Sequence, residues 1–153
     1  MADTSLNENR LGILVWQTSN LWQSKIRQIL KNSDLTFNEY LILETLYKLI
    51  DKQDSITQQD ICKNSSIDRS VVSQKINLLE EKKLLIRSQP KDKRSYSLSL
   101  TDSGFELVES FIRNVEKQES LMFDKLSSEI FNFTNSLKLI LGKKIRIKVK
   151  LND

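Results

Sequence analysis

Residues that break helices and form turns are scarce in this 153-residue chain, which contains three glycines and one proline. A sandwich or barrel of many strands needs turn residues about every 8–12 positions. The chain therefore favours a mainly helical fold. A glycine-rich nucleotide-binding loop is excluded as well, because Gly12, Gly104 and Gly142 lie far apart.

Other residue counts exclude several kinds of site. The chain has no histidine, which excludes a histidine-based triad, a histidine-ligated metal and a histidine pH switch. Its one cysteine, Cys62, excludes an internal disulfide. Residues 1–10 lack a basic-then-apolar signal sequence, and the longest apolar runs, Ile13–Trp16 and Tyr40–Leu43, are too short to span a bilayer. We expect a soluble cytoplasmic protein with no metal, cofactor or membrane partner.

Charge is distributed unevenly along the chain, whose total is +4. Residues 56–100 carry a net +4, residues 101–137 a net −4, and residues 138–153 a net +5. Basic segments favour polyanionic partners such as nucleic acids, although a surface of mixed charge is an alternative explanation for each of them.

Apolar residues three and four positions apart predict helices on both sides of a central region. One series covers residues 11–30 and includes Leu11, Val15 and Trp22. Another covers residues 102 to about 125, and a last helix is expected to start at Ser127, before an extended basic tail. We expect these last two helices to bury Leu107, Phe111, Val115 and Met122, and then Ile130, Phe133, Leu137 and Leu141.

The central region predicts three shorter helices. Thr36 and Glu39 fit a capping box, in which the threonine accepts an amide N–H and the glutamate reaches back. Thr57 opens the helix Thr57–Lys63, and Asp68 caps a helix that runs to about Lys83. The residues expected to be buried are Tyr40, Leu43, Leu46, Tyr47 and Ile50 in the first helix, Ile61 and Cys62 in the second, and Val72, Ile76 and Leu79 in the third.

Two strands, Leu84–Gln89 and Ser95–Leu100, are predicted next. A short helix, a turn, a second helix and a hairpin, in this order, form a winged helix-turn-helix. The outer face of helix 68–83 carries short or polar side chains, which allow a helix to enter the major groove of DNA; a solvated face is the alternative. The candidate DNA-contacting residues on that face are Arg69, Ser70, Ser73, Gln74 and Asn77.

The hairpin loop favours the DNA-binding interpretation. Held between two strands, the cations Lys91, Lys93 and Arg94 are expected to protrude. A protruding arginine can enter a narrow minor groove, where negative potential is concentrated. An ordinary solubilising turn is the alternative, but it is a weak explanation beside a helix-turn-helix.

From Leu35 to Gly104 the sequence resembles the MarR (multiple antibiotic resistance regulator) family of bacterial transcription factors. The resemblance lies in Leu79–Arg87 and most strongly in Asp92–Gly104, which contains the family's D-x-R wing pattern followed by L-T-x-x-G. It implies that Asp92 orients Arg94 in the minor groove. The family usually has glycine where this chain has Lys83, so we expect the helix to end differently and the wing to be displaced.

The resemblance also implies that the flanking helices interlock into a homodimer. The predicted regions are an N-terminal dimerisation helix (1–34), a winged helix-turn-helix lobe (35–100), and C-terminal dimerisation helices with a basic tail (101–153). A small winged domain cannot cover all the apolar residues of the flanking helices. The aromatic ones among them are Trp16, Trp22, Phe111, Phe123, Phe131 and Phe133.

The expected function is that of a dimeric repressor of transcription. It reads a palindromic operator in double-stranded DNA through helix 68–83 in the major groove and the wing 90–95 in the minor groove. An enzyme is not expected, because the sequence contains no nucleophile–base pair, metal-ligand cluster or phosphate loop, and neighbours such as Glu80 and Glu81 point apart on a helix. The competing class is a winged-helix module that has lost DNA binding and works through protein contacts. Arg94 and the polar face of helix 68–83 argue against this class.

The sequence offers two further candidate sites, an effector pocket and Cys62. The family binds small aromatic or phenolic effectors between its dimer helices and DNA-binding lobe, and Trp16, Trp22, Tyr40 and Tyr47 are candidates for such a pocket. Core packing is the alternative for each of them. Cys62 occupies a small, buried position of the helix-turn-helix and is interpreted as core, with redox sensing as the alternative.

Overall fold

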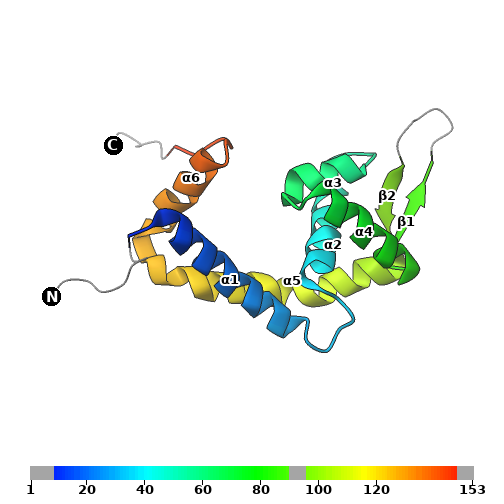
Figure 1. The fold of residues 1–153 in the computed structure, drawn as a ribbon, viewed down its shortest axis with the longest axis horizontal. Helices are drawn as coiled ribbons and strands as arrows, with labels where there is room; N and C mark the ends of the chain where they lie inside the picture. The colour runs from blue at the N-terminus through cyan, green and yellow to red at the C-terminus, as the bar shows by residue number, and fades with distance from the viewer. Residues whose placement is uncertain (1–8, 90–95, 148–153) are drawn as a thin grey trace, which may run out of the picture. The chain divides into compact units, whose positions relative to one another are not determined.

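The computed structural model describes residues 9–89 and 96–147 of the chain. Within these ranges the fold is mainly helical with one two-stranded antiparallel sheet, which confirms the winged helix-turn-helix (Figure 1). The chain divides into two compact units, Met1–Glu116 and Lys117–Asp153. The elements are α1 (Leu11–Ile29), α2 (Phe37–Leu49), α3 (Gln58–Ser65), α4 (Arg69–Glu81), β1 (Leu85–Ser88), β2 (Ser97–Leu100), α5 (Asp102–Phe123), the 3-10 helix η1 (Asp124–Glu129) and α6 (Ile130–Ile140).

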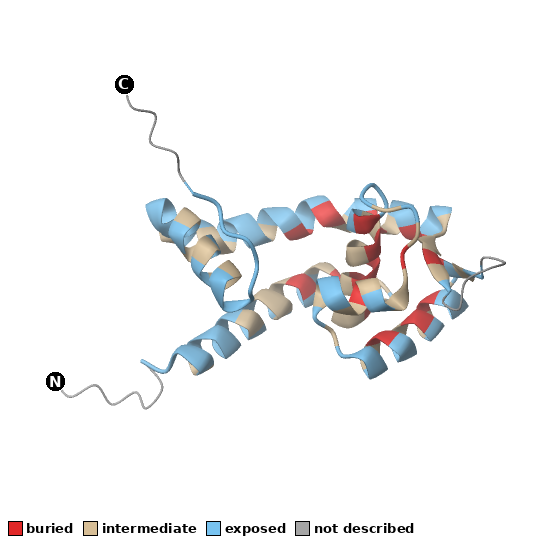
Figure 2. Cartoon of the chain, turned by 90° about the horizontal axis from the view of Figure 1, so that it is seen from above, coloured by how far each residue is buried: buried red, intermediate tan, exposed pale blue. Residues whose placement is uncertain are grey.

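The main core of the first unit lies between α2, α3, α4, the two strands and the first turns of α5 (Figure 2). Val72, Ile76 and Leu79 of α4 are completely buried, as their spacing predicts. Burial of one such side chain stabilises a fold by about 1.5–3 kcal/mol. The prediction for Ile50 is wrong: it is 39% exposed, because the inward face of α2 continues from Leu46 to Leu49 and leaves Ile50 turned outward.

A second cluster joins the end of α1 to the start of α2 and to α5. It contains Ile26, Leu30, Tyr40 and Val115 as its buried members. Much of α1 has no cover within the protomer, and Leu11 is 78% exposed.

The buried face of α5 agrees with the predicted one at Val115, which is 2% exposed, and differs from it earlier in the helix. Val108 and Ile112 are buried where Leu107 and Phe111 were expected, and the latter two are half-buried. The buried residues Gly104, Val108, Ile112 and Val115 form one regular helix face, and Gly104 on it lies close to the chain at Leu84.

Side chains cap the starts of α2, α3 and α5 among the described helices. Thr57 and Asp60 form a complete capping box at α3. At α2, Thr36 accepts from the Glu39 N–H at 3.3 Å and donates through Oγ1 to the Glu39 carboxylate at 3.1 Å, so the glutamate reaches back to the Thr36 hydroxyl and not to its backbone N–H. The same carboxylate also faces two lysines. Asp68 stands at the N-cap position of α4 as predicted, yet its side chain makes no cap hydrogen bond.

The end of α4 corrects a second expectation. Lys83 adopts the left-handed conformation, with φ 59°, that the family's glycine would adopt. Its N–H donates to the carbonyl of Glu80 at 2.9 Å and the Leu84 N–H donates to that of Leu79 at 3.0 Å, which is a Schellman motif. The helix therefore ends in the usual way, at a cost of about 1–2 kcal/mol for the side chain of Lys83.

The L-T-x-x-G pattern has a structural basis at the start of α5. Thr101 donates through Oγ1 to the Lys83 carbonyl at 2.7 Å and accepts from the Gly104 N–H at 3.0 Å. A Cβ atom on Gly104 would lie 2.0 Å from the carbonyl oxygen of Leu84. Only glycine fits there without a backbone shift.

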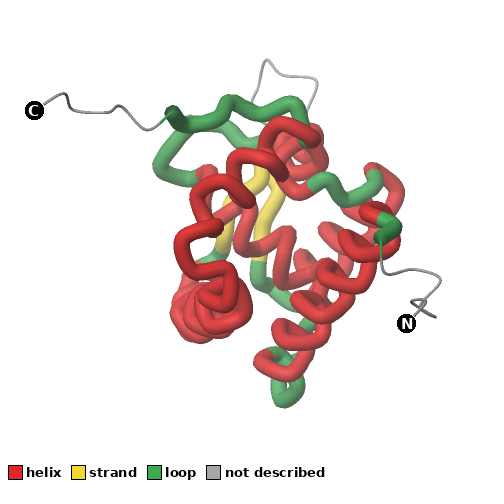
Figure 3. Tube along the Cα trace, turned by 90° about the vertical axis from the view of Figure 1, so that its left-hand side faces the viewer, coloured by secondary structure: helices red, strands yellow, loops and turns green. Residues whose placement is uncertain are grey.

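The two strands lie side by side in an otherwise helical chain (Figure 3). Leu85 pairs with Leu100 and Arg87 with Leu98. The Leu98 N–H donates to the Ile56 carbonyl at 2.7 Å, which joins the sheet to the segment before α3. Both strands are shorter than predicted; the wing loop that connects them, residues 90–95, lies outside the described residues.

The second unit contains the end of α5, η1 and α6. Ser127 does not begin the last helix as predicted: it lies inside η1 with φ 48° and ψ −121°, and α6 begins at Ile130. None of the four residues expected to be buried in the last helix is buried within the protomer. The prediction of an extended tail falls partly on residues 148–151, which lie outside the described ranges. No described helix is long and apolar enough to cross a membrane.

Candidate nucleic-acid interface

A tight turn fixes the angle between α3 and α4. Ser66 has φ 59°, and its N–H donates to the Cys62 carbonyl at 3.0 Å. The Ser65 hydroxyl donates to the Ile61 carbonyl and accepts from the Ile67 N–H at 3.2 Å. These bonds satisfy the end of α3 and allow α4 to start at Arg69.

The outer face of α4 is polar, as predicted. Ser73 and Gln74 are exposed, and Gln74 lies opposite the buried Val72 and Ile76. An exposed glutamine amide offers donors and an acceptor together, the pattern that pairs with the major-groove edge of adenine. The face also contains Arg69, Ser70 and Asn77, all exposed.

Asn77 has a partner that the sequence did not predict. Arg87 of β1 donates through Nη2 to Asn77 Oδ1, and its Nε lies 3.5 Å from a carboxylate oxygen of Glu80. The Asn77 carbonyl oxygen is therefore directed at the sheet. The sequence signal for Arg87 is its position two residues after the buried Leu85, on the same face of β1.

A buried carboxylate holds α4 from the side opposite its polar face. Glu39 of α2 is 2% exposed, and its carboxylate lies 2.6 Å from Lys82 Nζ and 3.7 Å from Lys75 Nζ. Lys82 also donates to the backbone carbonyl of Asp34. Burial alone lowers the pKa of Lys82, but its hydrogen bond to Glu39 and the nearby carboxylates outweigh that effect and raise the pKa. Both lysines thus fix the helix to the rest of the lobe.

The structure does not bring the four candidate effector residues together. Trp22 packs edge-on against Phe37, with ring centroids 5.4 Å apart, and shares a cluster with Tyr40. Tyr47 packs on the other core and donates to Glu109 at 3.0 Å, while Trp16 is 63% exposed.

The remaining candidate residues are those of the wing and Cys62. The wing residues Lys91, Asp92, Lys93 and Arg94 lie outside the described residues. Cys62, which was expected to be buried, is half-buried and packs against the main core. Within the described ranges, no three acidic or cysteine side chains are grouped as a metal site would require.

Comparison with known proteins places this geometry in a family. The model of the MarR family matches residues 33–95. An uncharacterized helix-turn-helix transcriptional regulator of Bacillus subtilis, YdcH, is 34% identical over 113 residues, which cover 73% of this chain and 77% of the relative. The regulator SarZ of Staphylococcus haemolyticus is 25% identical over 135 residues, which cover 88% of each chain.

Solved structures have the same fold. MepR of Staphylococcus aureus in complex with DNA has a TM-score of 0.78 and 28% identity, covering 89% of this chain and 97% of that one. BpsR of Bordetella bronchiseptica, whose DNA binding is regulated by 6-hydroxynicotinic acid, has a TM-score of 0.76 and 23% identity, covering 92% of this chain and 98% of that one.

Proposed function

Because the chain belongs to the MarR family of transcriptional regulators, we propose that it is a dimeric repressor that reads a palindromic operator in double-stranded DNA. It is a DNA-binding regulator and not an enzyme. The main support for the proposal is the exposed polar face of α4. The ion pair between Glu39 and Lys82 fixes the end of this helix to the rest of the lobe.

Direct reading of bases is assigned to α4. Gln74 and Ser73 lie on its outward face, and Arg69 and Ser70 stand in its first turn. Base edges in the major groove offer distinct donor and acceptor patterns to such groups. The wing, residues 90–95, enters the minor groove, where Asp92 orients Arg94 and the cations Lys91 and Lys93 bind phosphates.

Dimerisation is proposed because apolar residues lack cover in the protomer. In α1 these include Leu11, Val15 and Trp16, and in α6 Leu139 and Ile140, all more than half exposed. Two copies of α4 about 34–36 Å apart would read two half-sites of a palindrome. Sedimentation at micromolar concentration should give a dimer; a stable monomer with α1 folded would contradict this assignment.

The effector and the compartment are also proposals. A small aromatic or phenolic effector that releases DNA would bind among the aromatic residues of α1 and α2, with Trp22 and Tyr40 as the pair that already share a cluster. A regulator of bacterial genes acts in the cytoplasm, where the chromosome lies.

The test compares variants in binding titrations at one fixed salt concentration, on a duplex selected by the parent protein and its single-base-pair variants. Gln74→Ala should cost about 1–3 kcal/mol at one base pair and relax preference there. Arg94→Ala should weaken binding strongly with little change in major-groove preference, and Asp92→Ala should do the same more weakly. Gln28→Ala, an exposed change on α1, is the control. Equal binding by Arg94→Ala and the parent would refute the wing assignment.

A further inference from the structure

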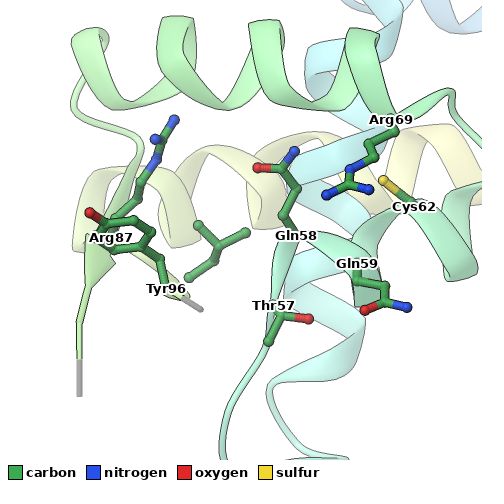
Figure 4. Close-up of a pocket in the computed structure, with 8 residues that line it drawn as sticks. Thr57, Gln58, Gln59, Cys62, Arg69, Arg87 and Tyr96 are labelled. Carbon is green, nitrogen blue, oxygen red and sulfur yellow. The ribbon is translucent and has the colours of Figure 1, made fainter. Parts of the chain in front are cut away.

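A cavity of about 380 Å³ lies in the second unit, between η1, α6 and the tail segment 143–147 that follows α6. It shares no lining residue with the groove of about 530 Å³ in the first unit, shown in Figure 4, which lies beside α4 and belongs to the DNA-binding face already described. Cavities that hold small molecules have volumes of about 300–1,000 Å³. The cavity in the second unit is therefore large enough for a small ligand.

Two sets of hydrogen bonds turn the tail back onto α6. Gly142 has φ 67°, and its N–H and that of the next residue donate to carbonyls in the last turn of α6 at 3.1 and 2.8 Å, which is a Schellman motif. The Asn135 amide then donates to the Arg146 carbonyl at 2.7 Å, and its side-chain oxygen accepts from the Arg146 N–H at 3.1 Å. Because both bonds use the main chain of Arg146, they fix its backbone against α6 and do not involve its guanidinium.

The cavity lies on a side of α6 that does not pack against α5. Phe133 packs with Phe123 of α5, with ring centroids 6.3 Å apart. At 3.6 residues per turn, Phe131, Asn135 and Lys138 lie about 140–160° around the helix from Phe133. The wall that α6 gives to the cavity is thus turned away from this aromatic contact, and the tail forms another wall.

The walls of the cavity combine two cations with an apolar surface. Lys138 and Arg146 line it together with Ile130, Phe131 and three residues that bear hydroxyl groups, and no carboxylate is among the described residues that line it. Lys138 follows Asn135 by three residues, which is about 4.5 Å along the helix, and the backbone of Arg146 is bound at Asn135 itself. Both long side chains can therefore reach one ligand group.

We propose that this cavity binds a small organic carboxylate with an apolar body, of the kind of a medium-chain fatty acid. The carboxylate lies between Lys138 and Arg146, because a guanidinium donates two parallel hydrogen bonds to its oxygens and the ammonium adds a second positive charge. The apolar body packs on Ile130 and Phe131 and is removed from water there. The inference goes beyond the proposed function and does not depend on it, since every residue it uses lies in the second unit.

The test is isothermal titration calorimetry of the full chain, without DNA, with octanoate below its micellar concentration as the probe. The neutral 1-octanol keeps the body and lacks the charge, and acetate keeps the charge and lacks the body. Each of them should bind at least about tenfold more weakly than octanoate. Arg146→Gln and Lys138→Gln should each weaken octanoate binding by about five- to tenfold, since each loses one charged hydrogen-bond partner.

Controls separate this site from a change in the fold and from a general effect of charge. Lys144→Gln removes an exposed cation of the same tail that is not among the residues lining the cavity, and it should keep the parent's affinity for octanoate. Arg146→Gln keeps the main-chain bonds to Asn135, so the tail stays in place. Thermal unfolding of each variant checks its stability. In amide NMR spectra of the parent, octanoate should shift the signals of Ser128, Thr134 and the Asn135 side chain.

Four results would overturn the inference. Equal octanoate affinity in the parent, Arg146→Gln and Lys138→Gln would show that these cations do not hold the ligand. Equal affinity for octanoate and 1-octanol would show that the site does not recognise a carboxylate. Amide shifts confined to α1 and α2 would place octanoate at the proposed effector site instead. Absence of octanoate binding at millimolar concentration would show that this face of α6 is closed to small ligands, for example by a second copy of the chain.

Discussion

Replacement of Glu39 by glutamine tests how α4 is held in the lobe. The substitution keeps the shape of the side chain and removes the charge that faces Lys75 and Lys82. At an effective dielectric constant of about 20, charges at the observed distances of 2.6 and 3.7 Å attract by about 6 and 4 kcal/mol. Desolvation of buried ions offsets several kcal/mol of this for each group.

The expected loss in the free energy of unfolding for Glu39→Gln is about 2 kcal/mol. It falls below the roughly 3–5 kcal/mol of a fully buried broken pair, because the side chains of Lys75 and Lys82 keep 19% and 25% exposure and can turn toward water. Since the folded state raises the pKa of Lys82, this stabilisation is complete below the ordinary lysine pKa. It is lost as pH rises through the higher pKa of the folded state.

The assay is urea unfolding of the parent, Glu39→Gln, Lys82→Met and the double variant, from which a coupling energy follows. The exposed pair Lys48–Glu116, at 3.0 Å, is the matched control, and exposed pairs contribute only about 0–1 kcal/mol. A coupling at Glu39–Lys82 no larger than that at Lys48–Glu116 would refute the reasoning.

Three further substitutions have expected outcomes in the same assay. Lys83→Gly should stabilise the fold by about 1 kcal/mol, since a left-handed residue with φ 59° no longer carries a side chain. Gly104→Ala should destabilise it by about 1–3 kcal/mol or more, because its Cβ would lie 2.0 Å from the Leu84 carbonyl oxygen. Glu44→Gln should stabilise it at pH 7, since burial raises the pKa of Glu44 despite the hydrogen bond from Tyr40. That gain should shrink as pH falls through the raised pKa, because the parent then becomes neutral as well.

Local patterns in the sequence predict those features that depend on neighbouring residues, namely the buried face of a helix and its first residue. The spacing of Val72, Ile76 and Leu79 predicts the buried face of α4, and Thr57 predicts the start of α3. Both depend on neighbours a few residues apart on one helix.

Contacts between distant elements escape the same reasoning. Glu39 reads as half of a capping box, yet it binds Lys82, 43 residues further along the chain. The sequence around Arg87 predicts only a strand residue. Its hydrogen bond to Asn77 depends on the packing of α4 beside β1. The close approach of Gly104 to Leu84 likewise joins two separate elements, and no local pattern predicts it.

The central claim is that α4 occupies the major groove of DNA and the wing the adjacent minor groove. Methylation interference on a selected duplex tests both at once, because dimethyl sulfate modifies guanine N7 in the major groove and adenine N3 in the minor groove. We expect N7 methylation to block binding in two clusters about one helical turn apart, and N3 methylation to block it beside each cluster. Interference confined to N3, or at neither atom while binding persists, would contradict the account.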